Sequence, residues 1–443
     1  MIPCIDLLQM VREGFQFLRG VVTDLQLNNL MMIATTVILY SRFSLSEVSR
    51  SWLKKRTINA FSHCLKAARF NLKEAMNAYA KMLRQSYDLK GGRFIIDDTM
   101  EHHTKLCKFI YGVCRHWDHV FRTNVSAKCL VFLYYSEGGV IKFPIGWRIY
   151  FKGGKKTKND LALELIQEGI KRGFPCGVVL ADSWYCVEPF VRELRWMGLR
   201  YVLEIKTNAT IREPIKKAEQ RGRGRKRKKW YRKVTIISYV QKVQRVREIG
   251  FLGDLATGKE EKILYEIKEK TCRIHALPGL HKVVYSYDPE KGSEKYLITN
   301  ELTWEGVKLV KEYFHRWVIE EFFRNAKQQL NMEGACVRSK QGVAITLFLL
   351  TCVDSLFHRE IAKLVSENSK AEPITVQSIV RLAVLENAEN FVSLIKSSKG
   401  EKFINRWITQ LKTDALRHRK VKSEVGYLNQ QIEGVSEVLD DGA

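Results

Sequence analysis

Three acidic residues stand where a folded chain could bring their side chains together. Asp98 follows the short buried strand predicted over Arg93-Phe-Ile-Ile-Asp97, and Asp182 follows the apolar run 177–181. Ligands and catalytic groups of open α/β sheets gather at the carboxyl ends of the strands, so both side chains are expected near one edge. The third acid, Glu320, lies in a segment with helical periodicity. An acid after a buried strand is also a common cap of the next turn, so the two aspartates alone do not define a site.

The segment around Glu320 is expected to form one long helix that begins near Thr303 and carries a polar stripe. At about 100° per residue, Arg316 lies at about −60° from Tyr313. On the same scale Glu320 lies at about −20° and Lys327 at about −40°. The opposite face carries the apolar residues of a core-facing surface, namely Phe314, Val318, Ile319, Phe322, Ala326 and Leu330. The alternative is an ordinary amphipathic helix with a solvated charged side.

The spacing Tyr-x2-Arg-x3-Glu-x6-Lys, present as Y-F-H-R-W-V-I-E-E-F-F-R-N-A-K from Tyr313 to Lys327, resembles the YREK signature of DDE-type cut-and-paste insertion-sequence transposases. The stretch 96–99, Ile-Asp-Asp-Thr, resembles the motif of that family's first acid, in which threonine follows the aspartate. The stretch 181–184, Ala-Asp-Ser-Trp, resembles the second motif. The resemblance covers roughly residues 91–355, including Trp117-Asp118-His119, but not the two ends of the chain.

The resemblance implies an RNase H-like catalytic core in which Asp98, Asp182 and Glu320 are both the catalytic acids and the metal ligands. Two Mg²⁺ ions are expected between them, for which Mn²⁺ can substitute, because hard cations prefer carboxylate oxygens. The implied reaction is DNA cleavage and strand transfer by in-line displacement at phosphorus.

The resemblance also implies DNA contacts for the other residues of the signature. Arg316 and Lys327 would bind backbone phosphates, one as a fork of donors and the other as a point charge. Tyr313 would hold the same DNA end through its hydroxyl.

Asp97 competes with Asp98 for the first position. Neighbouring residues of a strand point to opposite faces, so only one of the two can face the other acids. The threonine that follows favours Asp98.

Strands followed by alternating helices and strands predict a mixed α/β fold, an RNase H-like core with an inserted mostly β subdomain and helical ends. The expected domains are 1–90, helical and binding the DNA end; 91–206, the first part of the core; 207–293, the basic β-rich insertion; 294–360, the second part with the Glu320 helix; and 361–443, a helical region and tail. Ser44-Leu-Ser-Glu47 is expected to be a capping box, and Val234–Val240 a short strand. The N-terminal helices could instead serve only for packing.

The charge balance points to a polyanionic partner. The 443 residues include 74 Lys and Arg against 48 Asp and Glu, a net charge of +26. Nine of the thirteen residues from Arg221 to Lys233 are basic. The residues expected to contact the DNA backbone are Arg221, Arg223, Arg225, Lys226, Arg227, Lys228 and Lys229. The alternatives are a solvated loop or, in a eukaryote, a nuclear-import signal. Trp230, Tyr231 and Tyr296 could stack on an unpaired base or simply pack.

Other classes of protein are disfavoured. The ten cysteines are scattered, and Cys107, Cys114, His116 and His119 do not have the spacing of a structural zinc site. The apolar runs 30–40 and 343–353 are shorter than the roughly 20 residues of a membrane span, so a soluble, cytoplasmic, nucleoid-associated protein is expected. The partners expected are double-stranded DNA, both transposon ends and target, and a second copy of the chain in the DNA complex. The rival hypotheses are a nuclease or resolvase without strand transfer, and an inactive transposase-derived DNA-binding protein.

Overall fold

The computed structural model describes residues 2–53, 56–66, 70–103, 109–119, 121–139, 141–214, 231–241, 246–253, 260–335, 337–367, 374–397, 400–405 and 407–409. Side chains of residues 241–264 are not described. The basic residues from Arg221 to Lys229, Trp230, Cys107 and the tail after 409 therefore lie outside the described residues.

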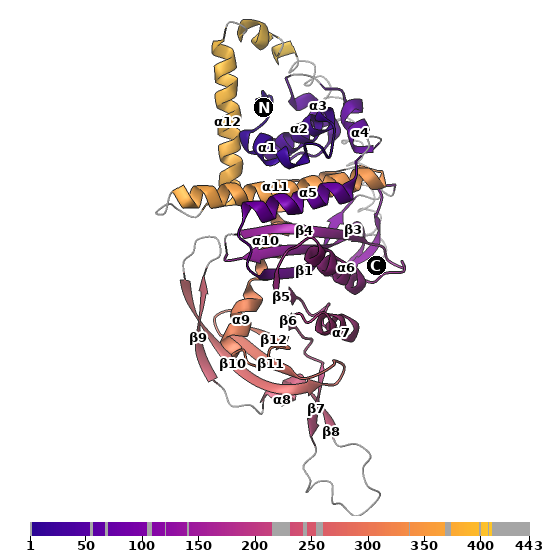
Figure 1. Ribbon diagram of the computed structural model, residues 1–443, viewed down its shortest axis with the longest axis vertical. Helices are drawn as coiled ribbons and strands as arrows, with labels where there is room; N and C mark the ends of the chain where they lie inside the picture. The colour runs from indigo at the N-terminus through magenta and orange to yellow at the C-terminus, as the bar shows by residue number, and fades with distance from the viewer. Residues whose placement is uncertain are drawn as a thin grey trace, which may run out of the picture.

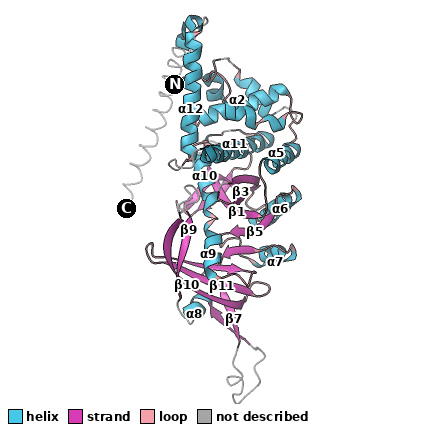
Figure 2. Cartoon of the chain, turned by 60° about the vertical axis from the view of Figure 1, so that its left-hand side comes forward, coloured by secondary structure: helices cyan, strands magenta, loops and turns pink. Residues whose placement is uncertain are grey.

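One long sheet forms the centre of the molecule (Figures 1 and 2). Within the described ranges its strands lie in the order β2-β3-β1-β5-β6-β12-β11-β10-β7-β8, with β4 beside β3 and β9 beside β10. The strands are β1 (Gly92–His102), β2 (Cys114–Asp118), β3 (Thr123–Glu137), β4 (Ile141–Tyr150), β5 (Cys176–Ala181), β6 (Tyr201–Glu204), β7 (Thr210–Pro214), β8 (Tyr231–Thr235), β9 (Val246–Gly253), β10 (Glu260–Ile274), β11 (His281–Asp288) and β12 (Ser293–Thr299).

The first half of this sheet is the expected core. β1, β3 and β4 pair antiparallel, and β5 and β6 follow parallel to β1. The two parallel connections run through α6 (Lys158–Lys171) and α7 (Glu188–Trp196), as a parallel pair requires. The prediction of a mixed α/β fold with an RNase H-like core is confirmed.

The β-rich segment after residue 207 is continuous with that core, because β12 pairs antiparallel with β6. The prediction of a strand over Val234–Val240 is wrong, since α8 (Ile236–Gln241) begins directly after β8. Ile236, Tyr239 and Val240 are buried at the i, i+3, i+4 spacing of one helix face, which a short window does not distinguish from strand periodicity.

Helices cover the end of the sheet that lies away from the β-rich segment. α5 and α11 lie side by side above β4, with the remaining N-terminal helices and α12 beyond them (Figure 1). These helices are α1 (Gln9–Gly14), α2 (Asp24–Tyr40), α3 (Leu45–Ser51), α4 (Ile58–Lys66), α5 (Leu72–Ser86), α11 (Lys340–Glu367) and α12 (Val376–Lys396), with the 3₁₀ turns η1 (Gln16–Leu18) and η4 (Met332–Gly334). The capping box predicted at Ser44 is absent: its side chain makes no cap hydrogen bond, and Glu47 pairs with Arg42 instead.

The segment predicted as one long helix is two helices, α9 (Gly306–Phe314) and α10 (Trp317–Gln328). The backbone bonds between them shorten from i−4 to i−3, as in His315 N–H to Glu312 and Arg316 N–H to Tyr313. Such a 3₁₀-type turn changes the angular relation between side chains on its two sides. The apolar period continues through the turn, so it could not reveal the break.

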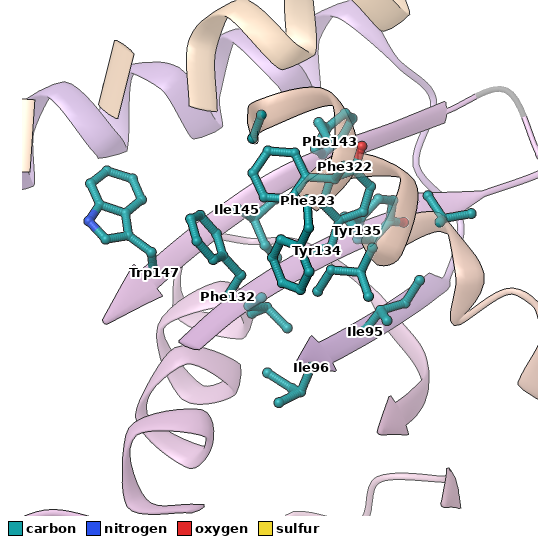
Figure 3. Packing of buried hydrophobic residues seen from close by; sticks show 14 of the residues in the cluster. Ile95, Ile96, Phe132, Tyr134, Tyr135, Phe143, Ile145, Trp147, Phe322 and Phe323 are labelled. Atoms are coloured by element: carbon teal, nitrogen blue, oxygen red, sulfur yellow. The ribbon is translucent and has the colours of Figure 1, made fainter. Parts of the chain in front are cut away.

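An aromatic cluster holds α10 against the sheet (Figure 3). The ring of Phe132 on β3 lies 5.0 Å from Phe322 and 5.7 Å from Phe323, centroid to centroid. Tyr134, two residues along β3, lies 5.3 Å from Phe322. Each such pair contributes about 0.5–1.5 kcal/mol beyond its buried area. The cluster therefore fixes the helix that carries Glu320.

α11 is the one described helix that is long and apolar enough to cross a membrane, but 89% of its apolar window is buried inside the fold. A core helix of a soluble protein has this property, so the structure is compatible with a soluble protein.

Asp354 of α11 is a fully buried acid whose Oδ2 accepts a 3.0 Å hydrogen bond from the Tyr134 hydroxyl. Burial raises the pKa of Asp354 to about 7, and the bond from Tyr134 and the charge of Lys142 only partly oppose this. Between about pH 4 and 7 the folded state keeps the proton that the unfolded chain releases, so this group's stabilising contribution is lost as the pH rises.

Asp354→Asn should therefore gain stability relative to the parent chain as the pH rises from 4.5 to 7.5, by on the order of 1–4 kcal/mol. The amide oxygen still accepts from Tyr134, so the change mainly removes the buried ionisation. Urea unfolding of both proteins at the two pH values measures the difference. His358, whose pKa burial lowers to about 3, contributes with the opposite sign in both proteins, and its Nε2 lies 3.8 Å from Asp354 Oδ2, so its titration is measured in each. A difference that does not change with pH would contradict this account.

Candidate active site

β1 sends its two aspartates to opposite sides of the sheet. Asp97 pairs across the ladder with Phe132, which packs on α10, so Asp97 faces the helix of Glu320. Asp98 pairs with Val131 and faces the side covered by α6. The alternation expected from the sequence is therefore present, and the two carboxylates have different neighbours.

Arg316 joins the acids of β1 and α10. Its Nη1 lies 2.7 Å from Asp97 Oδ2, and its Nη2 bonds Glu320. The guanidinium is only 13% exposed and lies 5.7 Å from the ring centroid of Tyr313. Paired charges of this kind are strongly coupled, because little water separates them. Arg316 thus holds Asp97 and Glu320 at a fixed separation.

Asp182 stands next to Asp97. Ile96 pairs with Ala181 in the parallel ladder, so the two aspartates follow side by side on neighbouring strands. The Trp184 amide donates a 3.0 Å bond to Asp182 Oδ1 and thereby orients its carboxylate. Asp97, Asp182 and Glu320 thus come from three elements that meet at one edge.

The electrostatics of this edge are those of crowded carboxylates. The pKa of Asp97 is raised to about 7, with burial as the main cause, Asp182 and Asp98 adding to it and Arg316 opposing it. The pKa of Asp182 is also raised, by burial first and by the charge of Asp98, against the Trp184 amide and Arg316. A further positive charge nearby would stabilise the ionised form of each of these acids.

Asp98 has partners of its own. Lys158 Nζ lies 2.6 Å from its Oδ2, and the Tyr185 hydroxyl donates to its Oδ1 at 3.2 Å. The Cys129 thiol lies 3.6 Å from Oδ2. Neither Lys158 nor Tyr185 was identified from the sequence, since the residues of the ion pair stand sixty positions apart.

The hydroxyl of Tyr313 faces into the protein. The residue is 4% exposed, and its hydroxyl donates a 2.6 Å bond to Glu204 Oε2, which Lys295 also contacts at 3.3 Å. The DNA contact expected of Tyr313 would therefore require its hydroxyl to exchange partners. In this arrangement Tyr313 supports Arg316 with its ring.

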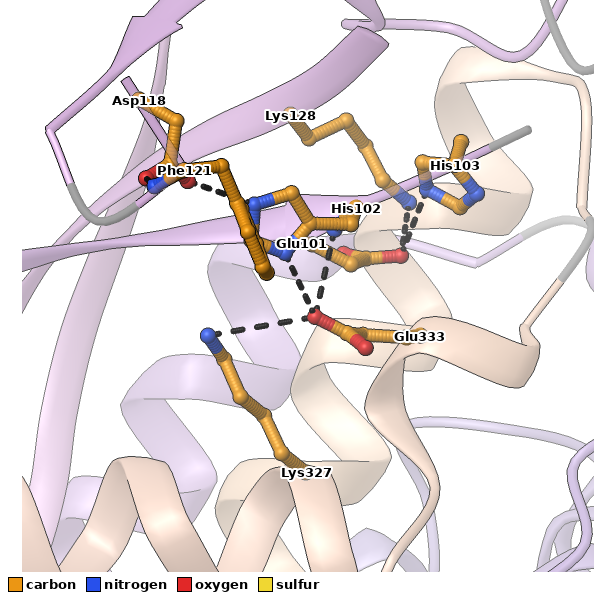
Figure 4. Close-up of polar contacts among 8 residues, drawn as sticks. All are labelled: Glu101, His102, His103, Asp118, Phe121, Lys128, Lys327 and Glu333. Atoms are coloured by element: carbon orange, nitrogen blue, oxygen red, sulfur yellow. Dashed lines mark hydrogen bonds and ion pairs between the residues drawn. The ribbon is translucent and has the colours of Figure 1, made fainter. Parts of the chain in front are cut away.

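Lys327 belongs to a polar cluster at the far end of α10 (Figure 4). Its Nζ lies 3.8 Å from Glu333 Oε1, which also accepts from the backbone amide of His102 at 3.2 Å. The ring of His102 connects Glu333 to Asp118 through contacts of 3.2 and 2.8 Å. The ends of β1, β2 and α10 are thereby tied together, and Glu333 is a further residue that the sequence motif did not indicate.

Of the other aromatic and thiol candidates, those among the described residues make contacts within the protein. Tyr296 is buried with its ring 5.2 Å from Tyr285, and Tyr231 lies 5.2 Å from the Arg212 guanidinium carbon. Cys114 Sγ lies 2.9 Å from His116 Nε2. Among the described residues no three His, Cys, Asp or Glu side chains are grouped as a metal-binding cluster.

The donor chemistry of the edge nevertheless fits a divalent cation. Asp97, Asp182 and Glu320 offer carboxylate oxygens, which hard cations prefer. Two of these acids carry raised pKa values, so additional positive charge is favoured there. Because Arg316 occupies one oxygen each of Asp97 and Glu320, full chelation by both residues would require it to release them.

Residues 36–250 match the family model of the DDE superfamily endonucleases. The matched range, a little under half of the chain, includes Asp97, Asp98 and Asp182 but ends before Glu320. No curated protein matches the chain. Together with the fold, the match supports a DDE-type endonuclease or transposase, a metal-dependent enzyme whose substrate is DNA.

Proposed function

We propose that this chain is a cut-and-paste transposase that binds the ends of an insertion sequence, cleaves them and transfers them to target DNA. The observation that supports the proposal is the Arg316 bridge, in which one guanidinium contacts both Glu320 of the Tyr-Arg-Glu-Lys signature and Asp97 of β1. The similarity to DDE endonucleases supports the cleavage step. Strand transfer rests on the signature alone.

The residues have separate tasks in this proposal. Asp182, Glu320 and one aspartate of β1 hold two Mg²⁺ ions, or Mn²⁺ in their place. When bound between these residues, divalent ions would supply the positive charge that favours deprotonation of the attacking water or 3′-hydroxyl and offsets charge on the leaving oxygen. Arg316 sets the position of Glu320 and Asp97 before DNA binds. When Arg316 exchanges a carboxylate for a phosphate, its fork of donors matches the two phosphate oxygens.

The same proposal assigns the DNA contacts outside the acid site, the number of copies and the cellular location. Lys327 contacts the DNA backbone at the end of α10, and the basic residues from Arg221 to Lys229 add affinity without sequence preference. Two DNA ends must be joined in one complex, so two copies of the chain act together on DNA. The protein works in the cytoplasm of a bacterium or archaeon, on nucleoid DNA.

The first acid is the point at which the sequence and the contacts favour different residues. The following threonine favours Asp98, whereas the shared Arg316 and the position beside Asp182 favour Asp97. We adopt Asp97 as the ligand and keep Asp98 as the alternative. On the α6 side, Asp98 positions Lys158.

Asp97→Asn should abolish cleavage of a labelled transposon end, and Asp98→Asn should reduce it by a smaller factor. The amide cannot supply the charge that a hard cation requires, while loss of the pair with Lys158 weakens only a supporting contact. Single-turnover rates in Mg²⁺ measure both effects, and binding in Ca²⁺ checks that each variant still takes the DNA. If Asp98→Asn is the more damaging change, the first position belongs to Asp98.

The complete proposal is tested with a donor DNA that carries the element's own ends and a supercoiled target. Excision followed by joined products in Mg²⁺ supports a transposase. Cutting without joining supports the nuclease alternative. Binding without cutting supports the inactive alternative.

A further inference from the structure

The loop between β4 and α6 is the most exposed basic segment beside the acid site. Residues 151–157 read Phe-Lys-Gly-Gly-Lys-Lys-Thr, and all seven are exposed. With Lys158 the segment carries four lysines, and it contains no acid before Asp160. Gly153 adopts a left-handed φ of +80°, which lets the loop turn sharply between strand and helix.

Lys158, which follows the loop, holds it beside β1 on the face of Asp98. Lys158 Nζ bonds Asp98 at 2.6 Å and lies 5.0 Å from the ring centroid of Trp184. Trp184 follows Asp182 by two residues and is 48% exposed. Lys206, two residues after the end of β6, has its Nζ 5.7 Å from the Trp184 ring centroid. The lysines therefore lie along one edge of the sheet, from the β4–α6 loop past the second acid to the end of β6.

The loop's exposed charges are largely uncompensated within the protein. Lys156 pairs with Glu164 at 2.5 Å. Among the described residues Lys152 and Lys155 make no ion pair with an acid. A single solvated lysine destabilises a fold very little. Several lysines on one short loop repel one another, and this repulsion favours the binding of a polyanion.

Two amides at the start of α6 are already bonded within the protein. Thr157 and Asp160 form a reciprocal cap: the Thr157 oxygen accepts from the Asp160 amide at 3.2 Å, and Asp160 Oδ2 accepts from the Thr157 amide at 2.8 Å. The lysine side chains are therefore the main groups on this loop that attract an anion.

We propose that Lys152, Lys155 and Lys156 bind the backbone phosphates of duplex DNA that flanks the scissile phosphate on the α6 side of β1. This inference rests on the proposed function, because that function makes the bound DNA the DNA being cut. The charge of the loop and its position beside β1 do not depend on whether the protein transfers strands. The expected partner of the loop is a nucleic acid backbone. Lysine ammonium groups are point charges that bind phosphates and do not read the base sequence.

The test compares the triple variant Lys152→Gln/Lys155→Gln/Lys156→Gln with a matched control, Lys171→Gln/Lys308→Gln/Lys363→Gln. The control removes the same charge from exposed positions on α6, α9 and α11, outside the segments proposed to contact DNA. Binding to a short duplex is measured in Ca²⁺ over a range of salt concentrations. The loop variant should lower the slope of log affinity against log salt by roughly 2–3, since each phosphate contact contributes about 0.9. The control should leave the slope within about 1 of the parent value.

Ethylation interference on an end-containing duplex locates the contacts. Interference at one to three phosphates beside the cleavage position should disappear in the loop variant and persist in the control. An unchanged slope, an equal fall in both variants, or an unchanged interference pattern would each overturn the proposal. Cleavage by the parent chain is scored separately: if it cuts nothing while the loop variant still loses slope, the proposed function fails and the DNA contact stands.

Discussion

Glu320→Gln leaves DNA binding almost intact and lowers Mg²⁺-dependent cleavage by roughly 10³-fold or more, because loss of a single group that stabilises the transition state already costs about 10²–10³. Glu320 stands on α10 in contact with Arg316, which also holds Asp97. The amide keeps the shape and can still accept from Arg316, but it cannot supply the charge that a hard cation needs.

The matched control for this change is Glu321→Gln. Glu321 is the neighbouring acid, lies 3.5 Å from Lys142 and points away from the Arg316 bridge. Single-turnover cleavage of one labelled end, with binding measured in Ca²⁺, separates the two variants. Substantial cutting by Glu320→Gln, or recovery of its rate at high Mg²⁺, would remove Glu320 from the catalytic acids.

Arg316→Lys is expected to lower the cleavage rate by roughly 10²-fold, the loss typical of a small displacement of a catalytic group. A single ammonium cannot reproduce the geometry in which two guanidinium nitrogens each hold a different carboxylate. Lys327→Arg should be tolerated much better, because Lys327 acts as a point charge beside Glu333.

A second measurement distinguishes positioning by Arg316 from a general loss of stability. The thermal midpoint of Arg316→Lys with and without Mn²⁺ reports how well the acids accept a cation once the fork is gone. A larger rise on Mn²⁺ addition than in the parent chain indicates that Arg316 and the cation share carboxylate oxygens. Near-normal cleavage by Arg316→Lys would mean that the Arg316 bridge has a structural role only.

The parts of the fold that could be predicted are those set by local sequence. The apolar runs before Asp98 and Asp182 are strands. Short segments rich in β-branched and aromatic residues and bounded by glycines are typical of strands. The Tyr-Arg-Glu-Lys spacing located the helix of Glu320, with its apolar face on Phe132. The break at His315 and Arg316 was not predictable, because 3.6-residue periodicity does not distinguish i−3 from i−4 bonding over one turn.

The side-chain partnerships of the site depend on tertiary structure. Arg316 contacts Asp97 across 219 residues of chain, and Tyr313 contacts Glu204 across 109. A helical wheel correctly placed Arg316 near Glu320 but could not show that a strand acid would take its other nitrogen. The choice between Asp97 and Asp98 depends on which face of β1 meets α10, and strand alternation alone leaves that face undetermined.

Residue 90 is the expected end of the N-terminal helical domain, but α5 packs against the rest of the chain. The Tyr79 hydroxyl bonds the Pro144 carbonyl at 3.0 Å and also bonds Ser355, so one side chain spans the helical region, the sheet and α11. The first residues of the chain also contact α12, where the side-chain amide of Asn387 donates to the carbonyl of Pro3. A fragment that starts at residue 91 would uncover the apolar surface of α11 and strand these polar groups. The helical region is thus no detachable module, because its inner surface packs against β4 and α11 and belongs to the same fold.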